Sequence, residues 1–416
     1  MENKINLGDK ENYNFEKEFE KTSDPEIKVP VEKFFNELHP EVFLIPKDRH
    51  FHIVNKQGLS LESERQIFPF SSLDIYIDFH KEQKDVFQEF YHLKAFSRLA
   101  NIGKRDHSIL TAALMEVILA RNGFSKNERD AAVLTAACHD IAMPAGGNLT
   151  QEIDYKNLNK EENFSLAMER SGLIEKWNKQ FGFDILLASD WVKNKHLIGK
   201  LLDVLDKISY VALDCYHIRK LSQQQKIKSQ IHSICACHPL IMDVWQDIQF
   251  LPDKTNFGFS NPDKLFNFLL LRAHTFKEVF KNPDSKTLEY FLAQKSKLLY
   301  EKGIVTKEQL LTNDDQWLMS ILNKYYFEEI KKYLEPGALC WKRFSTLEEQ
   351  EEFIFQKENK IIHSIYDAGF SAGLDLPIIS QDEETVKPIR KVINNESIDQ
   401  LKEIAEPMGY YVYYKK

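Results

Sequence analysis

Long apolar runs are the first feature that this sequence lacks. No stretch of about 18 consecutive apolar residues occurs in the 416-residue chain, which argues against a membrane-spanning helix. Residues 1–21 alternate acids and bases around no apolar centre, so we expect no secretory signal. A G-x-x-x-x-G-K-[ST] motif is missing too, which argues against a P-loop. We therefore expect a cytoplasmic protein without a membrane partner.

Cysteine is scarce, and its spacing predicts no disulfide framework. The chain has five cysteines: Cys138, Cys215, Cys235, Cys237 and Cys340. Their odd number fits a reducing compartment. Cys235, Cys237 and His238 together suggest a metal cluster, but a closed zinc site needs four ligands and no second pair accompanies them. Packing in the interior is the default interpretation for these residues.

Positive charge is neither in excess nor clustered. The net charge is −8, with 43% apolar and 28% charged residues, a composition typical of globular proteins. Binding to duplex nucleic acid depends on neutralising phosphates and calls for a basic stripe. The scattered lysines and arginines of this chain argue against an extended nucleic-acid platform and leave room for a small basic pocket.

The patterning predicts a mainly α protein with a small α+β part at the C-terminus. Apolar periodicity is helical over most of the chain, whereas the last residues, GYYVYYKK, are β-prone. We divide the chain into a mobile charged tail (1–30), a lead-in with short strands (31–90), a helical core (91–225), a helical extension (226–330) and an α+β region (331–416).

Three helices are predicted in the core region. The segment 106–123 is apolar on nearly all sides, which indicates a buried helix ended by Gly123. Ser125 and Glu128 form a capping-box pattern before the apolar run AAVLTAAC. The third helix covers 196–221 and presents an apolar face to the core.

The strongest chemical signal is the pair His139–Asp140 at the end of that apolar run. Two polar side chains that follow a buried segment need a partner inside the protein, and a metal ion would supply one. The alternative is that His139 only caps its helix and Asp140 opens the next turn. Two further residues favour the metal site. His107 starts another buried helix and Asp206 lies in the third helix, and each would otherwise be isolated at an apolar interface.

The third helix carries a polar stripe of Asp206, Tyr210, Asp214 and His217. Their spacing of four, four and three residues places them on one face. A solvated surface stripe is the alternative interpretation, and for Asp214 and His217 alone it is the better one. Asp203 shares this face and rivals Asp206 as a ligand.

Two imidazoles and two carboxylates suit a divalent metal ion. His107, His139, Asp140 and Asp206 would bind Mn, Fe, Ni, Mg or Zn and leave positions open for water and substrate. Such an ion can polarise a phosphoryl oxygen and lower the pKa of bound water. The pattern therefore indicates hydrolysis of a phosphate ester.

The order H…HD…D resembles that of the HD-domain metal phosphohydrolases. Within them, the chain is similar to the deoxynucleoside-triphosphate triphosphohydrolases, including the dGTPases and the SAM-and-HD-domain type. The likeness covers roughly residues 90–325 and lies in FSRLANIGKRDHS (96–108), LTAACHDIAMPAGG (134–147), DKISYVALDCYHI (206–218) and, more weakly, LLLRAHTFKEVFKNP (269–283).

The resemblance implies a helical HD bundle and a role for several residues. The metal ligands would be the two histidines and two aspartates above, Lys104 would stand where the family has arginine, and Lys207 and Tyr210 would contact phosphates. Asp214 would face the sugar, and Arg272 would grip the triphosphate. The resemblance also implies a homo-oligomer, since family members commonly assemble.

The chain departs from the family pattern in the substrate half of the site. Met143 stands where the family has a histidine, and Phe280 and Asn282 stand where a tyrosine and a histidine would bind phosphate. The segment that carries the family's proton-donating histidine offers only Glu161 and Glu162. A carboxylic acid can act as general acid if burial raises its pKa, whereas solvated acids at a helix start are the alternative interpretation.

Three functions are consistent with this pattern. The first is hydrolysis of a nucleotide, with a deoxynucleoside triphosphate cleaved to deoxynucleoside and triphosphate. The second is a phosphodiesterase or phosphatase that acts on another phosphate ester. The third is a nucleotide-binding sensor that keeps its metal site without turnover.

Overall fold

Helices make up most of the described chain, as the sequence predicts. The computed structural model describes residues 42–47, 50–55, 104–151, 153–225, 242–281, 283–313, 315–333, 338–367, 370–380, 385–405 and 409–416. The predicted tail, most of the predicted lead-in (31–90) and the Cys235–Cys237–His238 group lie outside these residues. Within the described part, no helix is both long and apolar enough to span a bilayer.

The first half of the chain holds a hairpin and the helices of the core. These elements are β1 (Val42–Lys47), β2 (His50–Asn55), α6 (Lys104–Arg121), α7 (Lys126–Cys138), α8 (Asn148–Gln151), α9 (Tyr155–Leu158), α10 (Lys160–Ser171), α11 (Ile174–Phe181), α12 (Ile185–Val192) and α13 (His196–Gln225). The predicted lead-in with short strands contains β1 and β2, which pair antiparallel with each other.

The second half adds further helices and short strands. They are η2 (Met242–Asp247), β3 (Ile248–Phe250), β4 (Phe257–Phe259), α16 (Pro262–Thr275), the π-helical η3 (Phe276–Phe280), α17 (Pro283–Glu301), α18 (Lys307–Thr312), α19 (Asp315–Tyr333), β5 (Leu339–Phe344), α20 (Leu347–Lys357), η4 (Glu358–Lys360), β6 (Ile361–Asp367), β7 (Pro377–Ile379), β8 (Val386–Pro388), η5 (Ile389–Lys391), α21 (Asn395–Ala405) and β9 (Gly409–Lys415).

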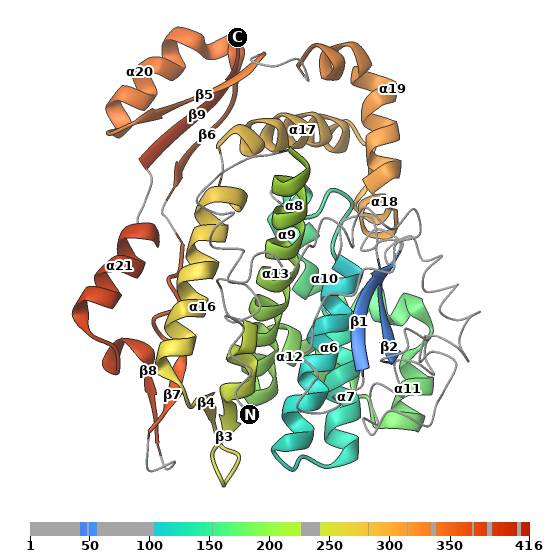
Figure 1. Cartoon of the computed structure of the whole chain (residues 1–416). Helices are drawn as coiled ribbons and strands as arrows, with labels where there is room; N and C mark the ends of the chain where they lie inside the picture. The colour runs from blue at the N-terminus through green and yellow to red at the C-terminus, as the bar shows by residue number, and fades with distance from the viewer. Residues whose placement is uncertain are drawn as a thin grey trace.

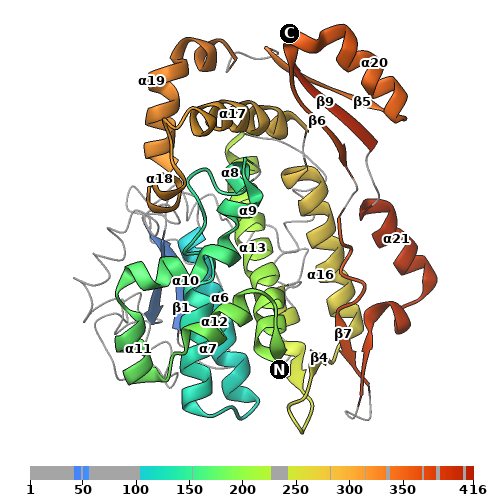
Figure 2. The same cartoon turned by 180° about the vertical axis from the view of Figure 1, so that it is seen from behind.

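The long helix α13 is the centre of the main core. It runs between α6 and α7 on one side and α16 on the other (Figures 1 and 2), and it contacts both α6 and α16. Its fully buried positions include Leu201, Leu205 and Ile208. They belong to the apolar face predicted for this helix, and they pack into one apolar cluster with α6, α7, α12 and α16.

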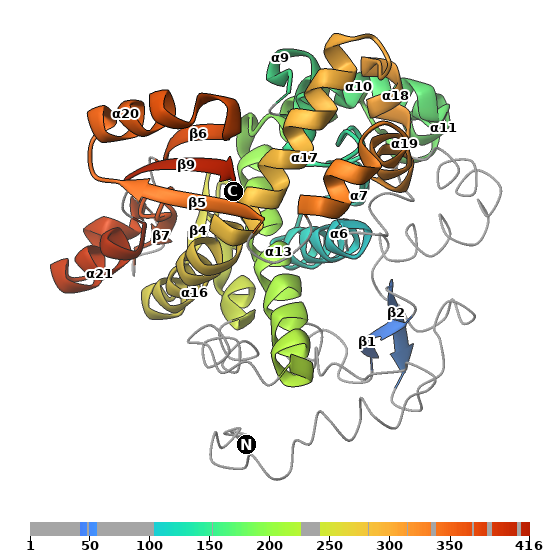
Figure 3. The same ribbon diagram turned by 90° about the horizontal axis from the view of Figure 1, so that it is seen from above.

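A second apolar core is built around α17. The strands β5, β9 and β6 form an antiparallel sheet with β9 in the middle. Tyr411 and Tyr413 of β9 pack against Tyr290 of α17 in this core, while Phe353 of α20 covers the opposite face of the sheet through Tyr414. From above, α17 separates this sheet and α20 from α10, α11, α18 and α19 (Figure 3).

A small mixed sheet joins segments that the sequence placed in different regions. Its order is β3-β4-β7-β8, and the parallel pair aligns Phe259 with Ile378. The sheet therefore ties the predicted helical extension to the predicted C-terminal region, and α19 runs past the predicted border at residue 330. The β-prone C-terminal residues form β9 as predicted, and α21 precedes this strand in the predicted α+β region.

The start of α7 is fixed by the predicted capping box. The Ser125 side chain accepts a hydrogen bond from the backbone of Glu128, and the Glu128 carboxylate accepts one from the Ser125 backbone. Every residue of α7 from Asp130 to Cys138 is buried, so the cap sets the position of a helix with little freedom to shift.

Ser125→Ala should lower the free energy of unfolding by about 1 kcal/mol, because the backbone N–H of Glu128 loses the Ser125 hydroxyl that accepts its hydrogen bond. The measurement is the urea midpoint followed by circular dichroism. Ser125→Thr keeps an accepting hydroxyl and serves as the matched control. Equal midpoints for the alanine, threonine and wild-type proteins would show that the cap contributes nothing.

Candidate metal centre

His107 enters the site from the first turn of α6. Its side chain is buried, with 6% exposure, and its backbone carbonyl accepts a hydrogen bond of 2.8 Å from Thr111. Because α6 packs against both α7 and α13, a residue at this end of α6 faces the junction of the three helices. This burial fits the predicted role of His107 at an otherwise apolar interface.

His139 and Asp140 lie where α7 ends. His139 is the C-cap residue of the helix, and the chain then turns tightly, with hydrogen bonds from Ile141 to Cys138 and from Met143 to Asp140. Adjacent residues of a regular helix point about 100° apart. Because the helix stops here, both side chains can turn toward one point, and both are buried.

The ring of His139 is held in one tautomer. Its Nδ1 lies 2.7 Å from the carbonyl oxygen of Ala136, and since a carbonyl can only accept, Nδ1 carries the proton. The neutral ring then presents the lone pair of Nε2 to the site. A backbone carbonyl that orients a histidine through its other nitrogen is a common feature of metal-binding imidazoles.

The two imidazoles and a carboxylate from α13 converge. The Nε2 atoms of His107 and His139 are 3.2 Å apart, and Oδ1 of Asp206 lies 2.7 Å from the first and 3.0 Å from the second. The rival Asp203 instead pairs with Lys207. His107, His139 and Asp140 form a buried group whose ligand atoms all lie within 4.8 Å of one another.

These distances fit a shared divalent ion. Two nitrogens bound to one ion at ~2.1 Å are separated by roughly 3.0 to 3.4 Å, for bond angles between octahedral and tetrahedral. The Nε2–Nε2 distance of 3.2 Å falls in this range. The group of His107, His139 and Asp140 could therefore hold a metal ion, and Asp206 stands beside it.

The charges of the site also favour a cation. Burial lowers the pKa of His107, so this ring stays neutral more readily than a free imidazole. Burial opposes charge on His139 as well, but Asp140 and Asp206 outweigh it and raise the pKa of His139. Burial alone would raise the pKa of Asp206, yet its close contacts with the ring nitrogens of His107 and His139 hold that pKa well below its usual range.

Lys160 is a site residue that the sequence did not reveal. Its ammonium forms an ion pair with Oδ1 of Asp140, while Oδ2 of Asp140 lies 3.8 Å from Nε2 of His139. Burial tends to lower the pKa of Lys160, but the charges of Asp140 and Asp206 raise it. The residue opens α10 next to the predicted Glu161, and no spacing rule separates it from an ordinary surface lysine.

The residues expected to bind phosphate lie between α13 and α16. The Nε of Arg272 donates to the Tyr210 hydroxyl at 2.8 Å, and its Nη1 donates to the Ser371 carbonyl at 2.8 Å. Lys207 and Arg272 line one cavity of about 220 Å³, together with Asp203. The structure thus brings together Lys207, Tyr210 and Arg272, although their contact with a substrate remains a prediction.

The two expected proton donors differ in their surroundings. Glu162 forms an ion pair of 2.7 Å with Lys193, and its side chain is 63% exposed. Glu161 is half-buried beside Lys160. For Lys104 at the start of α6 and Asp214 in α13, the structure describes the backbone and not the side chain.

Met143 and Phe280, which differ from the family pattern, both pack against other side chains. Met143 is buried and accepts a contact of 3.4 Å from the amide of Gln151. Phe280 stands edge-on to Tyr210, with ring centroids 5.9 Å apart. Asn282 lies outside the described residues. Apolar side chains therefore occupy positions where the family has polar ones.

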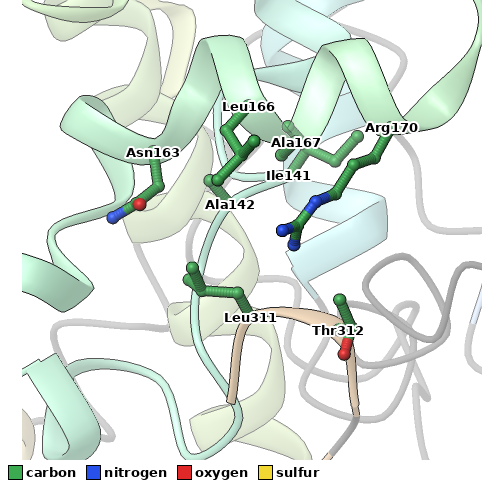
Figure 4. Close-up of a pocket in the computed structure, with 8 residues that line it drawn as sticks. All are labelled: Ile141, Ala142, Asn163, Leu166, Ala167, Arg170, Leu311 and Thr312. Atoms are coloured by element: carbon green, nitrogen blue, oxygen red, sulfur yellow. The ribbon is translucent and has the colours of Figure 1, made fainter. Parts of the chain in front are cut away.

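A small hollow next to the turn after Asp140 is too small for a substrate. It is about 30 Å³ in volume, far below the ~300–1,000 Å³ of a typical ligand site. Figure 4 shows Leu166 and Ala167 of α10 facing Leu311 across it. Arg170 at its rim pairs with Glu308 at 2.9 Å, so this hollow is a packing gap between α10 and α18.

The purified protein should contain about one divalent ion per chain, as a site of three or four ligands requires. His139→Ala should lose most of this metal, because the variant removes one of two imidazole ligands. His196→Ala is the matched control, since this histidine is 60% exposed beside Asp190. The measurement is inductively coupled plasma mass spectrometry, and equal metal content in the two variants would contradict the assignment.

Lys160→Met should strongly destabilise the protein in EDTA, by about 3–5 kcal/mol, because the buried Asp140 loses its ammonium partner. Added Mn²⁺ should restore much of this stability by replacing the positive charge. Lys193→Met removes only a surface ion pair, worth about 0–1 kcal/mol, and serves as the control. Thermal unfolding curves with the same small shift for both variants would refute the role of Lys160.

The sequence matches no protein-family model and no curated protein. Among solved structures, a hypothetical protein from Aquifex aeolicus shares the fold, with a TM-score of 0.57 and 14% identity over 90% of this chain and 96% of that one. A phosphohydrolase from Bacteroides thetaiotaomicron VPI-5482 is also similar, with a TM-score of 0.49 and 15% identity over 74% of this chain and 86% of that one.

Proposed function

We propose that the chain is a metal-dependent phosphohydrolase of the HD type that hydrolyses a nucleotide. A deoxynucleoside triphosphate, cleaved to deoxynucleoside and triphosphate, is the first candidate substrate. The observation that carries the proposal is the convergence of the His107 and His139 Nε2 atoms, 3.2 Å apart, beside the carboxylates of Asp140 and Asp206.

The ion would be held by His107, His139, Asp140 and Asp206. When bound, it would supply a polarised phosphoryl oxygen and a water molecule of lowered pKa. The protein contributes orientation: the Ala136 carbonyl fixes the His139 ring, and Lys160 holds one oxygen of Asp140 so that the other faces the site.

The phosphates would bind at the junction of α13 and α16. Lys207 and Arg272 bring two cations to the cavity there, and Tyr210 is held in place by Arg272. Asp203 pairs with Lys207, and a phosphate can compete with it for the same ammonium. Lys104 and Asp214 complete the proposal as contacts to phosphate and sugar.

Glu161 is the proton donor of this proposal. It is half-buried at the start of α10, next to Lys160, whereas Glu162 is engaged with Lys193 at the surface. Protonation of the leaving oxygen by a carboxylic acid is general acid catalysis, which contributes ~10²–10⁴-fold. Comparing the activities of Glu161→Gln and Glu162→Gln therefore shows which of the two carboxylic acids donates the proton.

A second candidate function is hydrolysis of a smaller phosphate ester. The cavity beside Arg272 is about 220 Å³, below the ~300–1,000 Å³ of a typical ligand site, and Phe280 packs on Tyr210 where the family would have a polar group. Both observations favour a substrate that occupies less space than a nucleoside triphosphate.

The test is product release from a panel of deoxynucleoside triphosphates, cyclic nucleotides and simple phosphate monoesters with added Mn²⁺. We expect turnover that falls by more than about 100-fold in Asp140→Ala, because loss of a direct ligand should exceed the roughly 10–100-fold cost of losing an outer partner. Glu161→Gln should also lose activity and Glu162→Gln should not. Release of triphosphate selects the first candidate. Release of phosphate from a monoester, or of a nucleoside monophosphate from a cyclic nucleotide, selects the second.

Unchanged turnover in Asp140→Ala would refute the proposal. Nucleotide binding seen as a thermal shift, without turnover under any divalent metal, would also refute it and would identify a sensor instead.

A further inference from the structure

A second hollow lies on the far side of α16 from α13, against α21. Its volume is about 490 Å³, and it is bordered by Leu374, η5 and α21. Such a volume lies in the range of sites for small molecules, ~300–1,000 Å³. The helix α21 packs on α16, and it stands outside α16 in both side views (Figures 1 and 2).

Basic side chains dominate this hollow. Arg390, Lys391 and Lys402 line it, and Asp399, the one acidic residue among its described lining residues, lies 4.0 Å from the Lys402 ammonium. The chain as a whole carries a net charge of −8. Three basic side chains around this hollow therefore form a local positive region on a negatively charged protein. A concave region lined by one sign of charge concentrates ions of the other sign.

We propose that this hollow binds a phosphate chain, as free polyphosphate or as part of a nucleotide. Arg390 can bind a phosphate through two parallel hydrogen bonds, and lysines serve as point charges. Asn395 adds an amide on the same wall, and Leu374 and Ile398 add apolar surface. The proposal concerns binding alone, so it does not depend on the proposed hydrolysis.

The hollow is linked to the cavity beside Arg272 by a short turn. Asp375 lines that cavity and forms an ion pair of 2.9 Å with Arg390. The backbone of Arg390 also donates to the Leu374 carbonyl at 3.2 Å. The turn is seated on α16 at Gly373, where φ is +75° and a Cβ would lie 2.6 Å from Leu269, so only glycine fits.

Through this link, phosphate binding in the hollow would change the electrostatics of the cavity beside Arg272. The ion pair of Arg390 with Asp375 is exposed on both sides, at 50% and 76%, and exposed pairs are weak. A phosphate that takes the guanidinium of Arg390 would displace the carboxylate of Asp375. The negative charge of Asp375 at the wall of the Arg272 cavity would then lose its counterion.

The experiment is isothermal titration calorimetry of the full chain with tripolyphosphate and, in a second arm, with a nucleoside triphosphate, both in EDTA. Lys391→Gln combined with Lys402→Gln should weaken binding by about tenfold or more, since each loses a charge-assisted contact. Lys357→Gln combined with Lys360→Gln removes the same charge from exposed lysines at the end of α20 and should leave binding unchanged. Tighter binding of the nucleotide identifies a nucleotide site, and equal binding identifies a polyphosphate site.

Equal weakening by the two double variants would show unspecific attraction and overturn the proposal. No binding to the wild type would overturn it as well. If only Lys207→Gln weakens binding, the anion binds in the cavity beside Arg272, and the proposal fails while the proposed hydrolysis stands. If the wild type binds tripolyphosphate as expected but shows no turnover, the proposed hydrolysis fails and the proposed binding in the hollow stands.

Discussion

The structure around α6, α7 and α13 depends on two imidazole nitrogens that face each other 3.2 Å apart inside the protein. The Nε2 of His139 presents a lone pair, because its Nδ1 donates to a backbone carbonyl. Lone pairs and carboxylates gathered away from water require a positive charge among them. A proton on His107 can satisfy Asp206 alone, whereas a divalent ion satisfies both rings and the carboxylates together. The placement of His107, His139, Asp140 and Asp206 is consistent with this requirement.

Each helix contributes at a point where its geometry allows convergence. The first turn of α6 supplies His107, the end of α7 supplies His139 and Asp140, and the middle of α13 supplies Asp206. The same helix also contacts α16, and its residues Asp203 and Lys207 line the cavity beside Arg272. One helix therefore links the candidate metal centre to the basic cavity, and α16 connects that cavity to the basic hollow at α21.

The sequence predicted the parts of this arrangement that depend on local signals. The capping box at Ser125, the apolar run of α7 and the histidine–aspartate pair at its end can be recognised from neighbouring residues, and the structure confirms the cap and the buried His107, His139 and Asp140 group. Lys160 was missed because its pairing with Asp140 depends on how α10 folds back, which local composition does not encode. The parallel pairing of Phe259 with Ile378 was missed because it joins segments more than a hundred residues apart.

The most direct test of the central claim is a crystal structure of protein soaked with Mn²⁺, with data collected at a wavelength where manganese scatters anomalously. The account predicts a single strong anomalous peak between the Nε2 atoms of His107 and His139, within bonding distance of both and of a carboxylate oxygen of Asp140. Density without such a peak, with the two rings turned apart or bridged only by water, would contradict it.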